Sequence, residues 1–170
     1  MWRITPSLAE GRSHDNRVAA MTTPMRLLAL VALALALAGC ATQIPVPTSL
    51  AGTSWQLLAI DSMDDAQGTT RPGDPSRYTV TFGADGRAAF QLDCNRASGE
   101  WKATPATANA RSGQLIFSSL AGTRAMCAPG SLDQRLSGQL PYVRSYLFQD
   151  GQLHMSLLAD GGILHWAPVQ

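Results

Sequence analysis

The residues best suited to chemistry in the C-terminal part of this chain are two histidines, His154 and His165. A catalytic triad or a metal site there would need at least one of them, because imidazole is a common general base and metal ligand. Both fall in predicted strands joined by an Asp-Gly-Gly turn at 160–162. We expect their positions along the ladder to differ by about two to four residues, or roughly 7 to 13 Å. No third ligand stands nearby in the sequence. The pattern predicts outward-facing histidines, with no metal and no other cofactor.

Other catalytic patterns are missing from the sequence. It contains no Gly-x-Ser-x-Gly elbow, no phosphate-binding glycine-rich loop and no Cys-x-x-Cys pair. Asp64 and Asp65 are adjacent in a predicted loop, and without a partner they are typical of solvated surface. We therefore expect no enzymatic activity. A hydrolase would need Asp133, His154 and a serine to meet in the fold.

Length and composition narrow the class of protein. The chain has 170 residues, which favours one domain. Its 13 Lys and Arg against 12 Asp and Glu give a net charge of +1, too little to hold a phosphate backbone, so no nucleic-acid partner is expected. Only 15% of the residues are charged, and 15 Gly and 10 Pro accompany them, which favours a turn-rich β protein over a helical bundle.

The segment from Leu27 to Ala38 is a run of 12 apolar residues, shorter than the about 18 that a bilayer span needs. Arg26 precedes it and small residues follow, the order of a secretory signal peptide. The run ends in Leu-Ala-Gly-Cys at 37–40, which resembles the lipobox of bacterial lipoproteins. The resemblance implies cleavage before Cys40 and a diacylated thiol, and more than one acyl chain gives stable membrane attachment. The alternative is a free cysteine after an ordinary signal peptide.

The same resemblance divides the chain. We interpret residues 21–39 as the signal peptide and 40–49 as the lipidated cysteine and a spacer. The folded domain then covers 50–168. Residues 1–20 read as an extension upstream of the true start, because signal peptides usually have about 15 to 30 residues; a tolerated long leader is the alternative. Ala41 follows the cysteine where Asp would signal inner-membrane retention, so the resemblance favours the outer membrane.

The cysteine count is odd, which leaves one thiol to explain in an exported protein. Lipidation of Cys40 explains it, and Cys94 and Cys127 remain as the only intramolecular pair. Disulfides persist in an oxidising compartment. This bond would close a loop of about 33 residues and contribute roughly 3.5 to 4 kcal/mol. Two free buried thiols are the alternative.

Alternating apolar residues separated by turns predict mostly strands. The clearest unit is a hairpin in which Tyr78, Val80 and Phe82 alternate before an Ala-Asp-Gly turn, with a second alternating run from Ala88 to Leu92. Further strands are predicted at 54–60, 100–103, 114–117, 144–149, 152–159 and 163–167, with a solvated loop at 104–113 and a C-terminal meander.

One segment has a helical period. Leu132, Leu136, Leu140 and Val143 form a single apolar stripe. Ser131 and Gln134 are spaced as a capping box, and Pro141 should end the helix near Leu140.

Three segments together resemble the META domain family, which includes the HslJ-like lipoproteins. They are Leu-Ala-Gly-Thr-Ser-Trp at 50–55, Asp-Cys-Asn-Arg-Ala-Ser-Gly at 93–99 and Leu-Ala-Gly-Thr-Arg-Ala-Met-Cys-Ala at 120–128. The resemblance covers about 50–166 and implies a mainly β (α+β) fold, a small antiparallel β-barrel-like sheet with one short helix. It implies a link to heat shock and antibiotic tolerance, and no established enzymatic activity. Asp93 stands where many members have Gly, which leaves the local turn geometry open.

The residues beside the two cysteines allow two interpretations. Asn95 and Gly99 could punctuate a bend by adopting positive φ, which we favour, or could belong to a recognition loop. Arg96 and Arg124 flank the cysteines, so a disulfide could bring two guanidinium groups together to receive an anion. Ordinary surface arginines, or pairing of Arg96 with Asp93 or Glu100, are favoured over this.

These observations lead to one expectation about function. We expect a non-enzymatic lipoprotein, anchored in the outer membrane and facing the periplasm, that binds a protein or another envelope component and acts in stress tolerance. The alternative is a lipoprotein that binds a small ligand or inhibits a hydrolase. Loops on a rigid disulfide-stapled scaffold suffice for binding.

Overall fold

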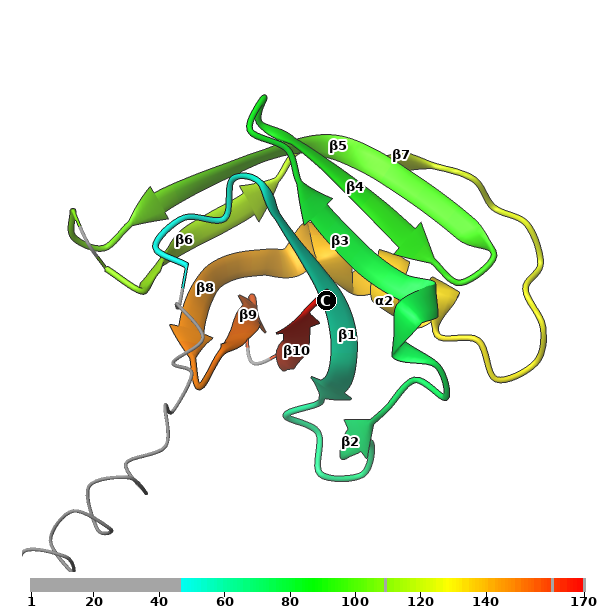
Figure 1. Ribbon diagram of the computed structural model, residues 1–170. Coiled ribbons are helices and arrows are strands. Elements are labelled where there is room, and N and C mark those ends of the chain that lie inside the picture. Colours follow the sequence, from blue (N-terminus) through cyan, green and yellow to red (C-terminus); the bar gives the residue numbers. More distant parts are fainter. Residues whose placement is uncertain (1–46, 109, 160, 170) are drawn as a thin grey trace, which may run out of the picture. The chain divides into compact units, whose positions relative to one another are not determined.

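Eight strands, along which apolar and polar side chains alternate, form a closed antiparallel barrel (Figure 1). The computed structural model describes residues 47–108, 110–159 and 161–169. Cys40 and the predicted leader lie outside the described residues. The barrel strands are β1 (Thr53–Asp61), β3 (Tyr78–Phe82), β4 (Arg87–Leu92), β5 (Asn95–Pro105), β6 (Ser112–Phe117), β8 (Val143–Gln149), β9 (Gln152–Leu157) and β10 (Ile163–Pro168).

Each barrel strand pairs with two neighbours. The order is β1-β3-β4-β5-β6-β8-β9-β10, and β10 pairs with β1 to close the ring. This seam runs from Trp55 opposite Pro168 to Asp61 opposite Ile163, with a register shift between Leu57 and Ala59. Closure removes the free edges of the sheet. Two short strands, β2 (Thr69–Thr70) on β1 and β7 (Ala121–Gly122) on β5, lie outside the ring.

β5 is the longest strand of the described chain and pairs with two different strands, β7 and β6, along one of its edges. Its first half pairs with β4 on one side and with β7 on the other, and its second half pairs with β6. Figure 1 shows the strand curving over the barrel with β7 laid beside it. The segment that leaves β7 is therefore held to the barrel wall where β5 begins.

The core fills the barrel with large side chains. Trp55 stacks on Phe148 with ring centroids 5.7 Å apart, and Phe82 meets Trp101 edge to face at 5.3 Å. Trp55, Leu57 and Ala59 are all buried, as their shared face predicts. The largest fully buried side chains are Trp55, Trp166, Phe82, Phe148, Leu57, Ile60, Leu115, Leu136, Leu140, Leu153, Met155 and Leu164.

The predicted hairpin is confirmed. β3 and β4 pair with Tyr78 opposite Leu92 and Phe82 opposite Ala88. The expected loop at 104–113 is shorter than predicted, because β5 continues to Pro105 and pairs it with Gly113 of β6. The C-terminal meander is present as β8, β9 and β10.

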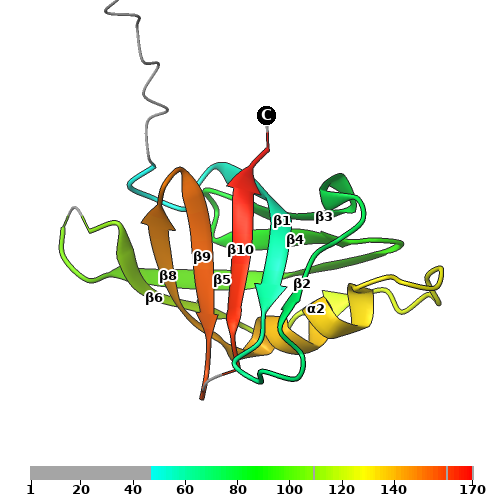
Figure 2. The same ribbon diagram turned by 90° about the horizontal axis from the view of Figure 1, so that it is seen from below.

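The predicted helix is α2 (Asp133–Gln139), at one end of the barrel (Figure 2). Its apolar stripe is confirmed, since Leu136, Leu140 and Val143 are fully buried. A 3-10 turn, η2 (Leu140–Tyr142), follows where proline interrupts the pattern, and another, η1 (Pro75–Arg77), precedes β3. No helix in the described part of the chain is long and apolar enough to cross a membrane.

The predicted capping box is wrong. The N-cap of α2 is Leu132, which makes no side-chain cap bond. The Tyr78 hydroxyl accepts the Leu132 N–H at 2.9 Å, and the Ser131 hydroxyl accepts the Asp133 N–H at 3.2 Å. Ser131 thus accepts an N–H at the start of the helix as predicted, and a tyrosine from β3 supplies a second acceptor, which sequence spacing cannot reveal.

The turn between β9 and β10 fixes the seam. Leu157 N–H donates to the Gly162 carbonyl at 2.9 Å, and Gly162 has φ of 117°. A Cβ at this glycine would collide with the Asp61 carbonyl oxygen of β1. Only glycine lets β10 start this close to the end of β1.

We predict that Gly162→Ala lowers the free energy of unfolding by roughly 2 to 4 kcal/mol. The positive φ is strained for any residue with a Cβ, and the added Cβ would clash with the Asp61 carbonyl oxygen. Urea denaturation followed by tryptophan fluorescence measures the change. Gly138→Ala in α2 is the matched control, since open space surrounds that position. It should be neutral or stabilising by up to about 1 kcal/mol. Equal effects of the two substitutions would contradict the role of Gly162.

Candidate functional site

A groove of about 860 Å³ lies between the segment after β7 and helix α2. Residues 120–126 form one side and, with Cys127, make up the groove segment. Figure 1 shows the chain running out from β7 and back to α2. Asp133, Gln134, Ser137 and Gly138 of α2, with Leu140 and Pro141, contribute the other side, while Leu92, Asn95 and Ala97 line it from β4 and β5. The groove therefore contains three of the residues singled out from the sequence, Asn95, Arg124 and Asp133.

Asn95 fastens the groove segment to the barrel. Its side-chain oxygen accepts the Ala125 N–H at 2.7 Å and the Thr123 hydroxyl at 2.9 Å. Its side-chain nitrogen donates to the Ala125 carbonyl at 2.9 Å and to the Asp133 carboxylate at 3.0 Å. One buried amide thus joins β5, the groove segment and α2. Because buried polar groups without partners are costly, this network specifies one arrangement of the three.

The expectation that Asn95 and Gly99 adopt positive φ is wrong. Both lie within β5, and Gly99 pairs with Ala88 of β4. The residue with positive φ is Asp93, at 60°, in the turn between β4 and β5. Glycine adopts this left-handed conformation easily, which accounts for the glycine of many family members at this position. Aspartate is one of the few other residues that tolerate it. The Asp93 carboxylate pairs with Arg77, and its N–H donates to the Arg77 carbonyl at 2.7 Å.

A disulfide joins Cys94 to Cys127, with Cα atoms 5.6 Å apart. It ties the turn before β5 to the far end of the groove segment, next to the bonds made by Asn95. The bond spans 33 residues, and by restricting the unfolded chain it contributes roughly 3.5 to 4 kcal/mol to the free energy of unfolding. The groove segment is therefore held at both ends, by β7 on β5 and by the disulfide.

The two arginines have different surroundings. Arg124 is exposed and lines the groove. Arg96 is exposed on β5, and its Nε donates to the Gln91 side-chain oxygen of β4 at 3.0 Å. The pairing considered for Arg96 with Asp93 is wrong, since Asp93 pairs with Arg77. Arg124 is the arginine that faces the groove.

The rim of the groove combines one cation with exposed apolar surface. Met126 is 96% exposed, far more than any other large hydrophobic residue of the described chain. Residues 123–128 continue from β7 without forming a strand of their own. The Asp133 carboxylate is buried and bound to Asn95, which leaves Arg124 as the charge at the rim. This surface suits a polar or acidic chain with an apolar side chain.

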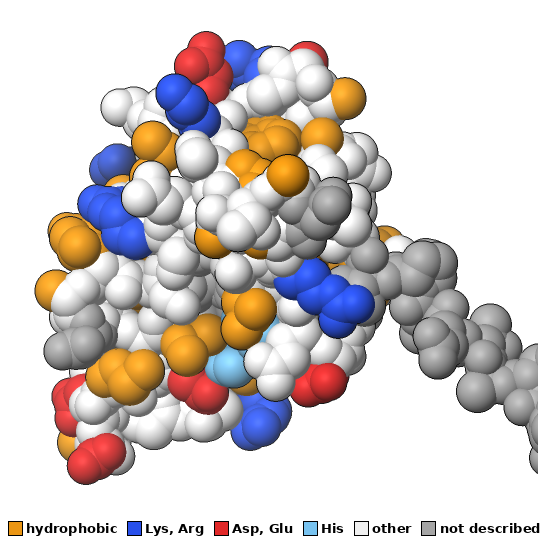
Figure 3. Space-filling view, turned by 90° about the vertical axis from the view of Figure 1, so that its left-hand side faces the viewer, with side chains coloured by type: hydrophobic (Ala, Val, Ile, Leu, Met, Phe, Trp, Pro, Cys, Tyr) orange, Lys and Arg blue, Asp and Glu red, His pale blue; other side chains and the backbone are white. Residues whose placement is uncertain are grey.

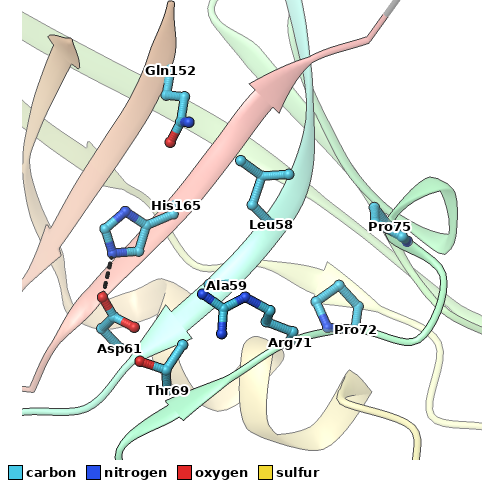
Figure 4. A pocket seen from close by; sticks show the side chains of 9 residues that line it. All are labelled: Leu58, Ala59, Asp61, Thr69, Arg71, Pro72, Pro75, Gln152 and His165. Carbon is cyan, nitrogen blue, oxygen red and sulfur yellow. Dashed lines mark hydrogen bonds and ion pairs between the residues drawn. The ribbon is translucent and has the colours of Figure 1, made fainter. Parts of the chain in front are cut away.

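A second cluster lies on the outer face of the seam. His154 of β9 and His165 of β10 are direct partners in the sheet, and their Nδ1 atoms are 2.8 Å apart. The opposite nitrogen of His165, Nε2, lies 2.8 Å from the Asp61 carboxylate of β1 (Figure 4). The expected offset of 7 to 13 Å between the two histidines along the ladder is wrong. The turn between β9 and β10, in which the Leu157 N–H donates to the Gly162 carbonyl, sets the two positions opposite each other.

The seam cluster borders a shallow hollow of about 500 Å³ that Leu58, Thr69, Arg71 and Gln152 also line (Figure 4). The Thr69 hydroxyl lowers the pKa of Asp61, partial burial opposes this, and His165 adds to the lowering. Burial lowers the pKa of His154, and the neighbouring His165 lowers it further. At neutral pH these shifts favour a charged Asp61 and a neutral His154.

The constellation that would indicate a hydrolase does not form. Asp133 is bound to Asn95 at the groove, whereas His154 contacts His165 at the seam. Within the described residues, no group of three or more His, Cys, Asp or Glu is arranged to hold a metal ion. Asp64 and Asp65 are exposed, as expected.

Sequence reasoning missed Asp61 and the partners of Asn95. Asp61 was not singled out, since a lone aspartate at a strand end has no pattern of its own. Thr123 and Asp133 were not linked to Asn95, because they stand 28 and 38 residues away from it in the chain. Only the pairing of β5 with β7 and the packing of α2 bring them to Asn95.

The sequence pattern of the META domain family matches residues 48–168. The chain belongs to the META domain family. A protein from Burkholderia xenovorans solved by NMR is similar to this META domain, with 25% identity and a TM-score of 0.53 over 74% of this chain and 92% of that one. A DUF4847 family protein from Bacteroides vulgatus is 13% identical, with a TM-score of 0.45, over 69% of this chain and 93% of the other. No curated protein matches the sequence.

The predicted family and the mainly β fold with one short helix are therefore confirmed for this META domain.

We predict that Asn95→Ala lowers the free energy of unfolding by roughly 2 to 4 kcal/mol, because it removes the hydrogen bonds that join three elements and leaves Asp133 buried without its amide partner. Gln114→Ala, on the exposed face of β6, is the control and should change stability by no more than about 0.5 kcal/mol. Urea titrations of both variants measure the difference. A loss at Asn95 no larger than the loss at Gln114 would contradict the network.

Proposed function

We propose that this META domain is the binding module of a lipid-anchored envelope protein that acts without catalysis in tolerance of heat or antibiotic stress. The groove beside α2 is the observation that carries the proposal. It is walled by a segment held at one end by β7 and at the other by a disulfide, and its rim exposes Arg124 and Met126.

The geometry favours binding over catalysis. The polar side chains deepest in the groove, Asn95 and Asp133, are hydrogen-bonded to each other. A catalytic acid or base needs to reach substrate, and these two are already engaged. The exposed features are an arginine, a methionine and a segment outside any strand, which suit recognition of a polypeptide.

The preferred partner is therefore an extended polypeptide with an acidic residue that reaches Arg124 and an apolar side chain that packs beside Met126. A rigid groove lowers the entropic cost of capturing such a segment. A small ligand is the second candidate, supported by the volume of the groove, and a hydrolase-inhibiting loop would be the exposed segment itself.

The anchoring part of the proposal rests on the Leu-Ala-Gly-Cys sequence at 37–40. Attachment through Cys40 to the periplasmic face of the outer membrane would hold the domain close to the membrane, because the spacer to the first strand is short. The domain itself needs no membrane-spanning element for this role.

We predict that the protein isolated from bacterial membranes carries acyl chains on Cys40, visible in the intact mass. Cys40→Ser should move it from the outer-membrane fraction to the soluble periplasm or leave it unprocessed. The circular dichroism spectrum of the released protein serves as the folding control. A Cys40 of unmodified mass in a membrane fraction would overturn the anchoring part of the proposal.

We predict that Arg124→Glu abolishes rescue of a deletion strain under heat or antibiotic stress, because charge reversal at the rim repels an acidic partner. Arg111→Glu, an exposed arginine at the far hairpin, makes the same charge change away from the groove and should rescue fully. Thermal melts should show both variants as stable as the wild type to within about 2 °C. Full rescue by a folded Arg124→Glu protein would contradict the groove as the binding site.

A further inference from the structure

The imidazole pair on the seam presents two nitrogen atoms to one point. His154 and His165 stand opposite each other on β9 and β10, with the rings at 83° and the two Nδ1 atoms 2.8 Å apart. The flanking residues Leu153, Met155, Leu164 and Trp166 are buried, so the histidines point to the outer face of the barrel. Figure 3 shows histidine surface exposed on one face of the molecule, beside acidic and basic side chains.

The Asp61 carboxylate selects the tautomer of His165. An ionised carboxylate accepts the proton on Nε2, so neutral His165 carries its lone pair on Nδ1, toward His154. Histidines that ligate metals usually donate their other ring N–H to a carboxylate in this way, which fixes the ring and raises its basicity. In the apo protein, a single proton shared between the two Nδ1 atoms occupies the place between them.

We propose that His154 and His165 together bind one divalent transition-metal ion, with copper(II) favoured, through their Nδ1 atoms. The ion lies to one side of the line between the two nitrogens, and His154 then carries its proton on Nε2 in place of Nδ1. Asp61 is the positioning residue for His165. The site is independent of the groove and of the proposed function.

The distance between the nitrogens points to the kind of ion. Two nitrogens 2.8 Å apart and about 2.0 Å from one ion subtend about 90° at it. This is the angle between adjacent ligands in the square-planar and octahedral sites typical of copper(II) and nickel(II). A tetrahedral zinc site would need the nitrogens to move apart to about 3.3 Å. Copper(II) also has the highest affinity of the divalent first-row ions for nitrogen ligands.

The surroundings favour a cation that exchanges readily. Asp61 faces the pair from β1, and Asp150, in the turn before β9, is near enough for its charge to act on His154. Arg71 lies on the far side of Asp61 and opposes this in part. With two protein ligands, water fills the other coordination positions from the open hollow. The geometry therefore describes a site for one readily exchanged ion with two protein ligands.

Copper(II) titration of the full-length chain without an affinity tag tests the proposal, by calorimetry and by electron paramagnetic resonance at neutral pH. The wild type should bind one copper(II) at the seam, with a spectrum split by two nitrogen ligands. His154→Gln and His165→Gln should each lose this ion or bind it roughly tenfold or more weakly, and the nitrogen splitting should fall to one. Asp61→Asn should weaken binding roughly 10- to 100-fold with two nitrogens retained.

Asp65→Asn is the matched control, because it removes one exposed carboxylate from the same part of the chain without touching the pair. It should bind copper(II) like the wild type. Circular dichroism and a urea titration check that each variant folds. Copper(II) binding unchanged by both histidine substitutions would place the ion elsewhere and overturn the proposal. A wild type that binds no copper(II) at micromolar concentration would also overturn it, and the pair would then be a hydrogen-bonded clasp of the seam.

Discussion

The pairing of β10 with β1 is the interaction on which the rest of the structure depends. Without it the sheet would expose two edges and could not enclose Trp55 and Trp166, which lie on the two strands of the seam. The seam forms because Gly162 lets β10 start against the Asp61 carbonyl. Closure also fixes how the wall curves, and hence where β5 begins and where α2 meets the end of the barrel.

The groove is a consequence of this rigid wall. β5 is long enough to hold β7 at its start, and Asn95 connects the segment beyond β7 to α2. The disulfide then restrains the segment covalently. A segment without regular secondary structure is thereby kept in one place, so that Arg124 and Met126 are exposed at a defined position. Binding surfaces gain affinity from this kind of preorganisation.

The two sites have different origins in the barrel. The groove results from a segment between β7 and α2 that the barrel, Asn95 and the disulfide hold in place. The histidine pair results from the seam itself, since Asp61, His154 and His165 come from three strands that are adjacent only in the closed barrel. The absence of a shared residue means that each site can be altered without changing the other.

The sequence by itself determined the elements whose signals are local. Alternation around the Ala-Asp-Gly turn predicted the β3–β4 hairpin, and the leucine stripe predicted α2, because side-chain period reports which face is buried. Only the tertiary structure decided what depends on distant partners: the Tyr78 hydroxyl that accepts the Leu132 N–H at the start of α2, the role of Asn95, and the alignment of His154 with His165. Each of these depends on the register or packing of separate strands, and that is set by closing one sheet around one core rather than by any local pattern.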